Sequence, residues 1–476
     1  MNIGPLNTKR PSSGLTMRSF FAIVVFLLLL GWIQSESLDQ FWDYTLILCA
    51  AILPAVLWIR LGTSGIPIFP AVCLAYIPYF AWPVLSLDRS MRAYDLSEIH
   101  RSAMTVMLFL LVATAAWRLV VRRTRGVNAS ISDPADQAGV IRLILVGIFA
   151  GVLFHAGIIT GWVSWFGSFF GLLRSVVLTL VTVSFFLAGV SRAQGFLRDD
   201  SWVAAVAGMG LIIVMSWSSL FLVSGMLFGL AAAFGYISVT KRVPWASVAA
   251  ILALVWVLHA GKSEMRNKYW SQSYAGESVS VLDLPGFTAE WFETGLNAIV
   301  TGETGQNLLD RASLMRLLLM AQRMTPTDID YLNGETYALL PSILVPRFIN
   351  PEKPDSQVGL TLLNIRYGVQ TRESAALTTI GWGLLPEAFA NFGYFGVIGM
   401  ALLLGFFCAG LERWSVDTKI LSIPMLASIA NIMVMINLEA DFINISLALI
   451  QSFLSVVIFT VLYRKFFIAT LRGKSA

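Results

Sequence analysis

The chain has 476 residues, of which 57% are hydrophobic and only 13% are charged, whereas a typical soluble domain carries about 25% charged residues. A soluble fold could not cover that much apolar sequence with a polar surface, so a soluble globular protein is excluded. The net charge of +5 does not indicate nucleic-acid binding, because most Lys and Arg residues stand at the ends of apolar runs, where they act as topology signals.

Successive apolar runs have about the length that a helix needs to cross roughly 30 Å of hydrocarbon. They predict an all-α polytopic membrane protein of about twelve transmembrane helices, at about 19–33, 43–59, 66–87, 102–121, 141–160, 169–190, 202–218, 220–239, 245–259, 392–411, 420–436 and 442–463. Lys and Arg concentrate on one side of this arrangement, and the short segments on the other side hold only Arg89, Arg92 and Arg101. This bias predicts a multi-pass membrane protein with both termini in the cytoplasm.

The segment after the ninth run differs in composition from the rest of the chain. It is rich in charged residues and is interrupted by Pro285, Pro326, Pro341, Pro346, Pro351 and Pro354. By the alternation of spans it lies outside the cytoplasm. We therefore expect a membrane bundle of about nine helices over 1–259, one large extracytoplasmic loop with amphipathic helices over 260–391, and about three membrane helices over 392–476.

One stretch of this loop has helical periodicity. Leu308, Ala312, Met315 and Leu319 recur at helical spacing, and Thr325-Pro326 ends the pattern. The periodicity fits an amphipathic helix at the membrane surface and, equally, an ordinary helix of a small lobe.

The first cationic cluster of the loop directly follows the ninth run. Lys262 and Arg266 are four residues apart, so they share one face if the helix continues. Two cations near the outer headgroups suit a lipid-linked pyrophosphate, with Tyr269 and Trp270 at the interface or stacked on a sugar. The alternative is an interfacial belt of snorkelling cations with an aromatic anchor.

The second cationic cluster is the proline strap, residues 341–354. Its four prolines oppose a helix and predict an extended backbone that presents Arg347 and Lys353. The arginine fork matches phosphate oxygens, and lysine adds a point charge. The alternative is a rigid, solvated loop with surface charges.

Glu387 lies in an apolar stretch just before the tenth run. Burial there would suit it to take a proton from a sugar hydroxyl. The alternative is a carboxylate stabilised by the dipole at a helix N-terminus. The three histidines, His100, His155 and His259, lack metal-ligand spacing, and the chain has no nucleotide-binding loop, so no metal or other cofactor is expected.

Three segments resemble those of the Wzy-type polymerases of O-antigen and exopolysaccharide: Gly334-Glu335-Thr336-Tyr337, Pro346-Arg347-Phe348-Ile349-Asn350-Pro351-Glu352-Lys353-Pro354 and Asn391-Phe392-Gly393-Tyr394-Phe395-Gly396. Members of this family carry a similar Pro-Arg and Lys-Pro strap in a large outer loop, before a Gly-rich entry to the next helix. Some also have an Arg followed by ten residues and a Gly, a spacing found here from Arg323 to Gly334 and from Arg372 to Gly383. Such relatives place the two copies in different outer loops, whereas both fall in one loop here.

The resemblance implies a metal-independent membrane glycosyltransferase, similar in fold to the GT-C kind. It would transfer a growing polyprenyl-pyrophosphate-linked glycan onto the next lipid-linked repeat unit at the outer face of the bacterial inner membrane. Fixed cations can stabilise the charge that develops on a pyrophosphate leaving group. We accordingly expect catalytic roles for Arg347 and Lys353, with Glu387 as base, and substrate contacts from Lys262, Arg266, Tyr269, Trp270, Arg323, Arg366 and Arg372. The expected partners are the lipid-linked donor and acceptor, membrane lipids, a chain-length regulator and a flippase, without nucleic acid.

Other function classes share this layout. An O-antigen ligase uses a similar donor and another acceptor; ligases resemble one another in a histidine of the large loop, and none lies between Ala260 and Ala376, which favours the polymerase. A lipid-linked-oligosaccharide flippase or a sugar transporter would need polar residues along a central path, whereas the charges here concentrate in one outer loop. A structural scaffold of a secretion complex is a further alternative.

Overall fold

The computed structural model describes residues 13–61, 66–86, 91–121, 131, 134–197, 199–240, 244–274, 279–301, 313–347, 349–377 and 379–463. Over these residues the protein is all-helical, without a β-strand. The helices that precede the large loop are α1 (Ser13–Gln34), α2 (Leu38–Leu61), α3 (Ile68–Tyr76), η1 (Ile77–Ala81), α4 (Trp82–Ser86), η2 (Met91–Ala93), α5 (Leu96–Val120), α6 (Pro134–Ile159), η3 (Trp162–Phe169), α7 (Phe170–Gln194), α8 (Asp199–Trp217), α9 (Leu222–Thr240) and α10 (Trp245–Tyr274). They are followed by η4 (Val281–Asp283), α11 (Leu284–Thr301), α13 (Leu314–Met324), α14 (Glu335–Ala338), α15 (Leu340–Leu344), α16 (Val358–Arg366), α17 (Arg372–Leu377), α18 (Leu384–Ser415), α19 (Ile423–Met435) and α20 (Phe442–Tyr463).

The predicted membrane class is confirmed by the length and composition of these helices. Within the described ranges, 10 helices are long and apolar enough to cross a membrane. The two remaining predicted spans correspond to shorter apolar stretches, Phe20–Gln34 and Ile423–Met435. The protein is therefore a polytopic helical membrane protein, and the count of twelve spans stays a prediction.

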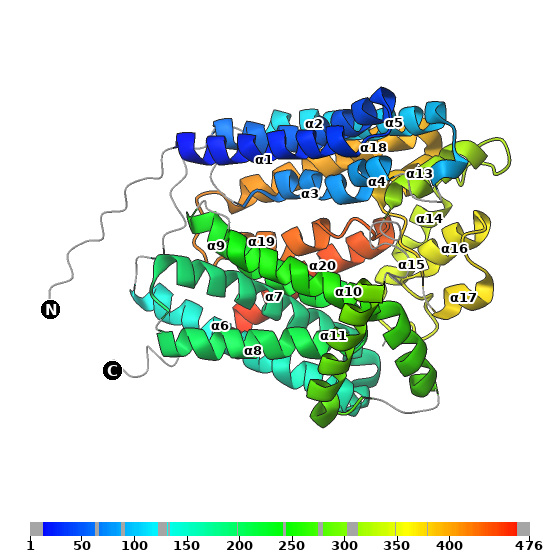
Figure 1. Cartoon of the computed structure of the whole chain (residues 1–476). Helices are drawn as coiled ribbons and strands as arrows, with labels where there is room; N and C mark the ends of the chain where they lie inside the picture. Colours follow the sequence, from blue (N-terminus) through cyan, green and yellow to red (C-terminus); the bar gives the residue numbers. More distant parts are fainter. Residues whose placement is uncertain are drawn as a thin grey trace, which may run out of the picture.

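The long helices run side by side as one bundle, and the short helices of the large loop gather at one end of it (Figure 1). α1 begins and α20 ends at the opposite end of the bundle. This arrangement is expected if the first and last helices have their chain ends on one side of the membrane and the large loop lies on the other. That the shared side is the cytoplasm stays a prediction from the charge bias.

α7 and α9 cross at backbone distance, because each presents a glycine to the other. A side chain at Gly189 would overlap the carbonyl of Ala232, and one at Gly235 would overlap the carbonyl of Phe186. Small residues at a crossing let two helix backbones approach closely, which is a common way for helices to associate within a bilayer. This reciprocal contact fixes α7 against α9 near the C-terminal ends of both helices.

The short helices between residues 313 and 383 form what we call the loop lobe. Its first helix, α13, ends at Met324, just before the predicted Thr325-Pro326 stop. Most α13 side chains are buried, and the helix packs against α5 and α18. The periodic stretch therefore belongs to a packed lobe instead of lying on the membrane surface; its first predicted members, Leu308 and Ala312, lie outside the described residues.

Two helices cross the predicted boundaries of the loop. α10 continues past residue 259 to Tyr274, because the polar segment that follows the apolar run contains no proline. α18 begins at Leu384 and kinks at Phe392 and Gly393, where φ is −140° and 58°. The predicted start of the tenth span at 392 thus coincides with the kink, and the first two turns of α18 carry polar residues that hydropathy alone assigns to a loop.

Candidate functional site

Two of the segments that carry the family resemblance meet at the kink of α18. The Leu332 amide donates to the carbonyl of Ala390 at 3.1 Å, and the Asn333 amide donates to the carbonyl of Asn391 at 3.0 Å. The Gly334 amide donates to Oδ1 of Asn391 at 3.0 Å. The 334–337 segment is thereby docked on the first two turns of α18, although 57 residues of sequence separate Gly334 from Asn391.

The glycines of the repeated Arg and Gly spacing have matching structural roles. Gly334 has a φ of 90° and immediately precedes α14, and Gly383 has a φ of 71° and immediately precedes α18. These are left-handed conformations that glycine adopts at little cost. The spacing from Arg323 and from Arg372 therefore ends, in both copies, at a turn that starts a helix.

Glu387 lies beneath this docked segment and is 0% exposed, so the burial expected from the sequence is present. Its Oε2 atom accepts a hydrogen bond from the Phe442 amide at 2.7 Å. The Thr336 hydroxyl, which accepts from Nδ2 of Asn391 at 2.9 Å, also interacts with the Glu387 carboxyl. Glu387 consequently contacts α14, α18 and the start of α20.

Asp441 is a second buried carboxyl at the same place, and it is not among the site residues predicted from the sequence. It caps α20: its Oδ1 atom accepts from the Asn444 amide at 3.0 Å and from Asn444 Nδ2 at 2.6 Å. Burial raises the pKa of the Asp441 carboxyl. An Asp that precedes an apolar run is the usual sequence sign of a helix cap, and that sign could have identified this residue.

Tyr337 covers the two carboxyls from the side of the loop lobe. Its ring packs edge-on against Phe442, with centroids 5.0 Å apart. Burial raises the pKa of the Tyr337 hydroxyl, and the nearby carboxyls of Glu387 and Asp441 raise it further. The three acidic groups are therefore close enough to influence one another.

The proline strap is more compact than the sequence predicts. Residues 340–344 form the short helix α15, because Pro341 stands in its first turn, where a missing amide hydrogen is tolerated. The rest folds into turns: the Ile349 amide donates to the carbonyl of Pro346 at 2.9 Å, and the Lys353 amide to that of Asn350 at 3.3 Å. The expectation of an extended backbone was wrong, since proline also favours tight turns.

The strap nevertheless brings its two cations close together. Lys353 is half-buried, and its Nζ atom donates to the carbonyl of Ile343 at 2.8 Å. Arg347 is exposed, and its guanidinium lies 3.4 Å from the carbonyl of Pro351. Burial lowers the pKa of Lys353, and the positive charge of Arg347 lowers it further. Arg347 and Lys353 are therefore neighbouring cations at the surface of the loop lobe.

The chain that leaves the strap runs to the carboxyl pair. The carbonyl of Ser356 accepts from Asn444 Nδ2 at 3.3 Å. A side chain at Gly359 would come within 2.8 Å of Oδ2 of Asp441. The 334–337 segment, the start of α18 and residues 356–359, which directly follow the strap, therefore surround one position.

Other cations proposed as substrate contacts serve the lobe itself. Arg323 forms a double hydrogen bond with the Glu98 carboxylate at the start of α5. Arg366 pairs with Glu335 at 3.1 Å. Arg372 lies exposed in the first turn of α17. The first two therefore tie helices together, and their role as substrate ligands would require breaking these pairs.

The first cationic cluster lies along the extension of α10. The Nη2 atom of Arg266 donates at 3.1 Å to the carbonyl of Leu220, which lies just before α9. The Tyr269 hydroxyl donates to Glu290 of α11 at 2.6 Å. These contacts anchor α10 to its neighbours, while the side chain of Trp270 lies outside the described residues.

Lys262 also lies on α10, and it interacts with a residue of another element, Glu439. Burial raises the pKa of Glu439, in the turn between α19 and α20, and the positive charge of Lys262 lowers it. Glu439 is two residues before Asp441. Of the predicted α10 contacts, Lys262 thus approaches the turn that leads to Asp441.

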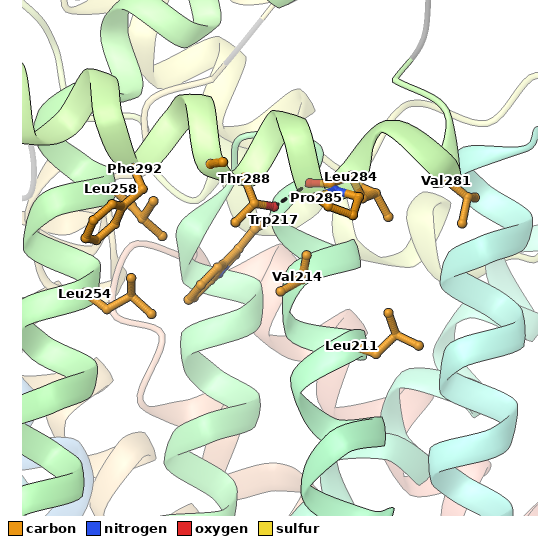
Figure 2. Close-up of a pocket in the computed structure, with 11 residues that line it drawn as sticks. Leu211, Val214, Trp217, Leu254, Leu258, Val281, Leu284, Pro285, Thr288 and Phe292 are labelled. Carbon is orange, nitrogen blue, oxygen red and sulfur yellow. Dashed lines mark hydrogen bonds between the residues drawn. The ribbon is translucent and has the colours of Figure 1, made fainter.

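A separate apolar groove of about 560 Å³ lies where α11 passes across α8 and α10. Figure 2 shows α11 above the two membrane helices, with apolar side chains directed into the space between them. The groove is lined by Leu211, Val214, Trp217, Leu254, Leu258, Val281, Leu284, Pro285, Thr288, Ala289 and Phe292. Exposed apolar side chains near both ends of α11, Leu282 and Val300, are typical of a helix at a membrane surface.

Within the described ranges, no three or more His, Cys, Asp or Glu side chains group as metal ligands. A comparison of the chain with protein-family models, with curated proteins and with solved structures finds no match.

Proposed function

We propose that this protein polymerises polyprenyl-pyrophosphate-linked oligosaccharide repeat units into O-antigen or exopolysaccharide at the outer face of the bacterial inner membrane. The observation that supports this proposal is the meeting of two segments that resemble the same enzyme family in sequence. The 334–337 segment docks on the start of α18 at one end of the bundle. Residues 356–359, which directly follow the proline strap, reach Asn444 and Asp441 at the same place.

The strap cations are assigned to the pyrophosphate of the donor. Arg347 is exposed and Lys353 is held beside it by the carbonyl of Ile343, so the two present adjacent positive charges. Lys262 reaches the neighbouring turn from α10. Such a fixed arrangement stabilises the negative charge that develops on the pyrophosphate as it leaves, without reorganising during the reaction.

In the proposed transfer, a hydroxyl of the acceptor sugar attacks the anomeric carbon of the donor glycan. The new glycosidic bond forms, the bond to the pyrophosphate breaks, and the hydroxyl proton passes to a carboxylate. Glu387 is our candidate acceptor of that proton. Because it is fully buried beneath Thr336, the 334–337 segment must move before a sugar can reach it.

The hydrocarbon chain of the carrier is assigned to the groove under α11. Both helices below the groove are long and apolar enough to cross a membrane, so their flanks face lipid. A chain in this groove exchanges lipid contacts for contacts with leucine, valine and aromatic side chains. Its headgroup would then lie near the outer end of α10, where Lys262 is found.

The test is deletion of the gene followed by analysis of lipid-linked and surface glycans. A polymerase deletion leaves single repeat units on the carrier, a ligase deletion leaves full polymers there, and a flippase deletion leaves repeats on the cytoplasmic side. In the complemented strain, Arg347→Ala should abolish polymer at normal protein level, while Arg347→Lys should retain part of it because the charge remains. Wild-type polymer lengths in the Arg347→Ala strain would remove the strap from the mechanism.

A further inference from the structure

Three polar atoms are buried together beneath the 334–337 segment. They are Oε1 of Glu387, Oδ2 of Asp441 and the hydroxyl oxygen of Tyr337, and among the described residues none of them has a hydrogen-bond partner. Both carboxyl side chains are 0% exposed. Buried polar atoms are nearly always hydrogen-bonded, so three neighbouring exceptions call for a physical explanation.

The surroundings of the two carboxyls stabilise one negative charge but not two. The partnered oxygens accept from the Phe442 and Asn444 amides, which belong to the first turn of α20. A helix N-terminus carries the equivalent of about half a positive charge. The groups that act on Glu387 are Asp441, the Phe442 amide and Thr336, and no Lys or Arg of the described chain is among them.

We propose that Glu387 and Asp441 form a proton-binding site that holds one proton between them, and that this proton keeps the 334–337 segment docked on α18 and α20. With one proton bound, the pair carries a single charge that the first turn of α20 can stabilise. Loss of the proton puts two negative charges side by side in a buried place. Opening of the segment relieves this repulsion, because it admits water to both carboxyls.

The elements packed around the pair bring two other acidic groups near it, Tyr337 and Glu439. α14 contributes Tyr337, whose raised pKa keeps it neutral through the physiological range. α16 contributes Gly359, which has no side chain. The turn before α20 contributes Glu439, with Lys262 of α10 beside it. The shared proton therefore belongs to the carboxyl pair.

The direction of the pH effect follows from burial. Burial raises the pKa of Asp441 in the docked state, and opening returns it toward its ordinary value. The docked state therefore binds more protons than the open state, and its stability falls as pH rises through the raised pKa. If one proton is released on opening, the open fraction rises by up to about tenfold per pH unit over that range.

The test measures how fast an introduced cysteine at position 336 reacts with a membrane-impermeant maleimide between pH 6 and pH 9. The reporter is Thr336→Cys, which is fully buried when the segment is docked, in full-length protein whose Cys49, Cys73 and Cys408 are replaced by alanine. Each rate is divided by that of the same reporter carrying Glu387→Gln and Asp441→Asn together. This ratio cancels the pH dependence of the thiol itself.

We expect the ratio to rise by up to about tenfold per pH unit with the native pair. With Asp441→Asn or Glu387→Gln alone the ratio should rise less, because one buried carboxyl remains but the repulsion between two like charges is gone. Asparagine is also a good helix cap, so Asp441→Asn preserves the start of α20. Glu412→Gln is the matched control. Glu412 is a buried glutamate of the same helix whose two oxygens both have partners, so its replacement should leave the ratio of the native pair unchanged.

A flat ratio with the native pair, or an equal rise with Asp441→Asn, would overturn the proposal. Hydrogen exchange of the Asn333 and Gly334 amides, in protein with native Thr336, gives the same comparison without a reporter cysteine, should that variant fail to fold. Neither measurement uses a glycan substrate. The proton site therefore stands or falls independently of the proposed polymerase activity.

Discussion

Replacement of Asn391 by alanine tests the geometry of the candidate site most directly. The Asn391 side chain is fully buried. Its Oδ1 accepts from the Gly334 amide at 3.0 Å, and its Nδ2 donates to the Thr336 hydroxyl at 2.9 Å and to the carbonyl of Glu387 at 2.9 Å. The first two of these bonds join the loop lobe to α18, and the third lies within the helix.

The size of the effect follows from the two bonds that cross to the lobe. Each hydrogen bond contributes about 1 kcal/mol net, so their loss costs about 2 kcal/mol of docking free energy. That corresponds to a roughly 30-fold larger open fraction. In Asn391→Ala, the Leu332, Asn333 and Gly334 amides should therefore exchange hydrogen about 30-fold faster, as measured by mass spectrometry on the purified protein.

Asn364→Ala is the matched control. Asn364 is also fully buried, but it binds the carbonyl of Ile380 at 3.0 Å and the Trp382 indole at 2.9 Å, in another part of the lobe. This variant should leave exchange at residues 332–334 unchanged. If Asn391→Ala exchanges within twofold of the parental protein, or if both variants accelerate these amides equally, the side chain does not hold the segment in place.

Three further results are expected. In thermal denaturation of the purified protein, Arg323→Ala and Glu98→Ala should each lower the free energy of unfolding by about 1 kcal/mol. The double variant should lose less than the sum of the two single losses, and additive losses would contradict the pairing. Burial and Arg347 lower the pKa of Lys353, so Lys353 loses its charge at a lower pH than a free lysine does. Polymer synthesis in isolated membranes should therefore decline on the alkaline side, and Lys353→Arg should extend the active range to higher pH. An unchanged alkaline limit in Lys353→Arg would exclude Lys353 as the titrating cation. Glu412→Ala should destabilise the protein by about 3 kcal/mol, because the carboxylate accepts from the Phe69 amide and the Trp117 indole. Glu412→Gln should cost about half of that, because its amide keeps one acceptor. Equal losses of stability in the two variants would refute this account.

The membrane bundle could be predicted because hydropathy is a local property of the sequence. Each predicted span overlaps a helix of the structure, and within the described ranges ten of these helices are long and apolar enough to cross a membrane. The start of α18 was missed because Glu387 and Asn391 interrupt the apolar pattern. Their polar groups are satisfied by Phe442, Thr336 and Gly334, which hydropathy does not detect.

At the candidate site, only features that depend on a single segment of the sequence could be predicted. Family-like segments and the burial of Glu387 were visible in the sequence. The pairing of Arg323 with Glu98 joins positions 225 residues apart, so it depends on how α13 packs against α5. The carboxyl of Glu387 comes close to that of Asp441 only when α18 packs against the start of α20. Tertiary packing, and not residue type, decides whether such a charge is structural or available.

The glycine crossing of α7 and α9 limits how this protein can change shape. Where carbonyls of one helix meet the α-carbons of the other, neither can slide without a clash. These helices therefore act as a stationary frame. A change of shape therefore falls to elements outside this crossing, such as the 313–383 region, where the positive φ angles of Gly334 and Gly383 give the backbone freedom to turn.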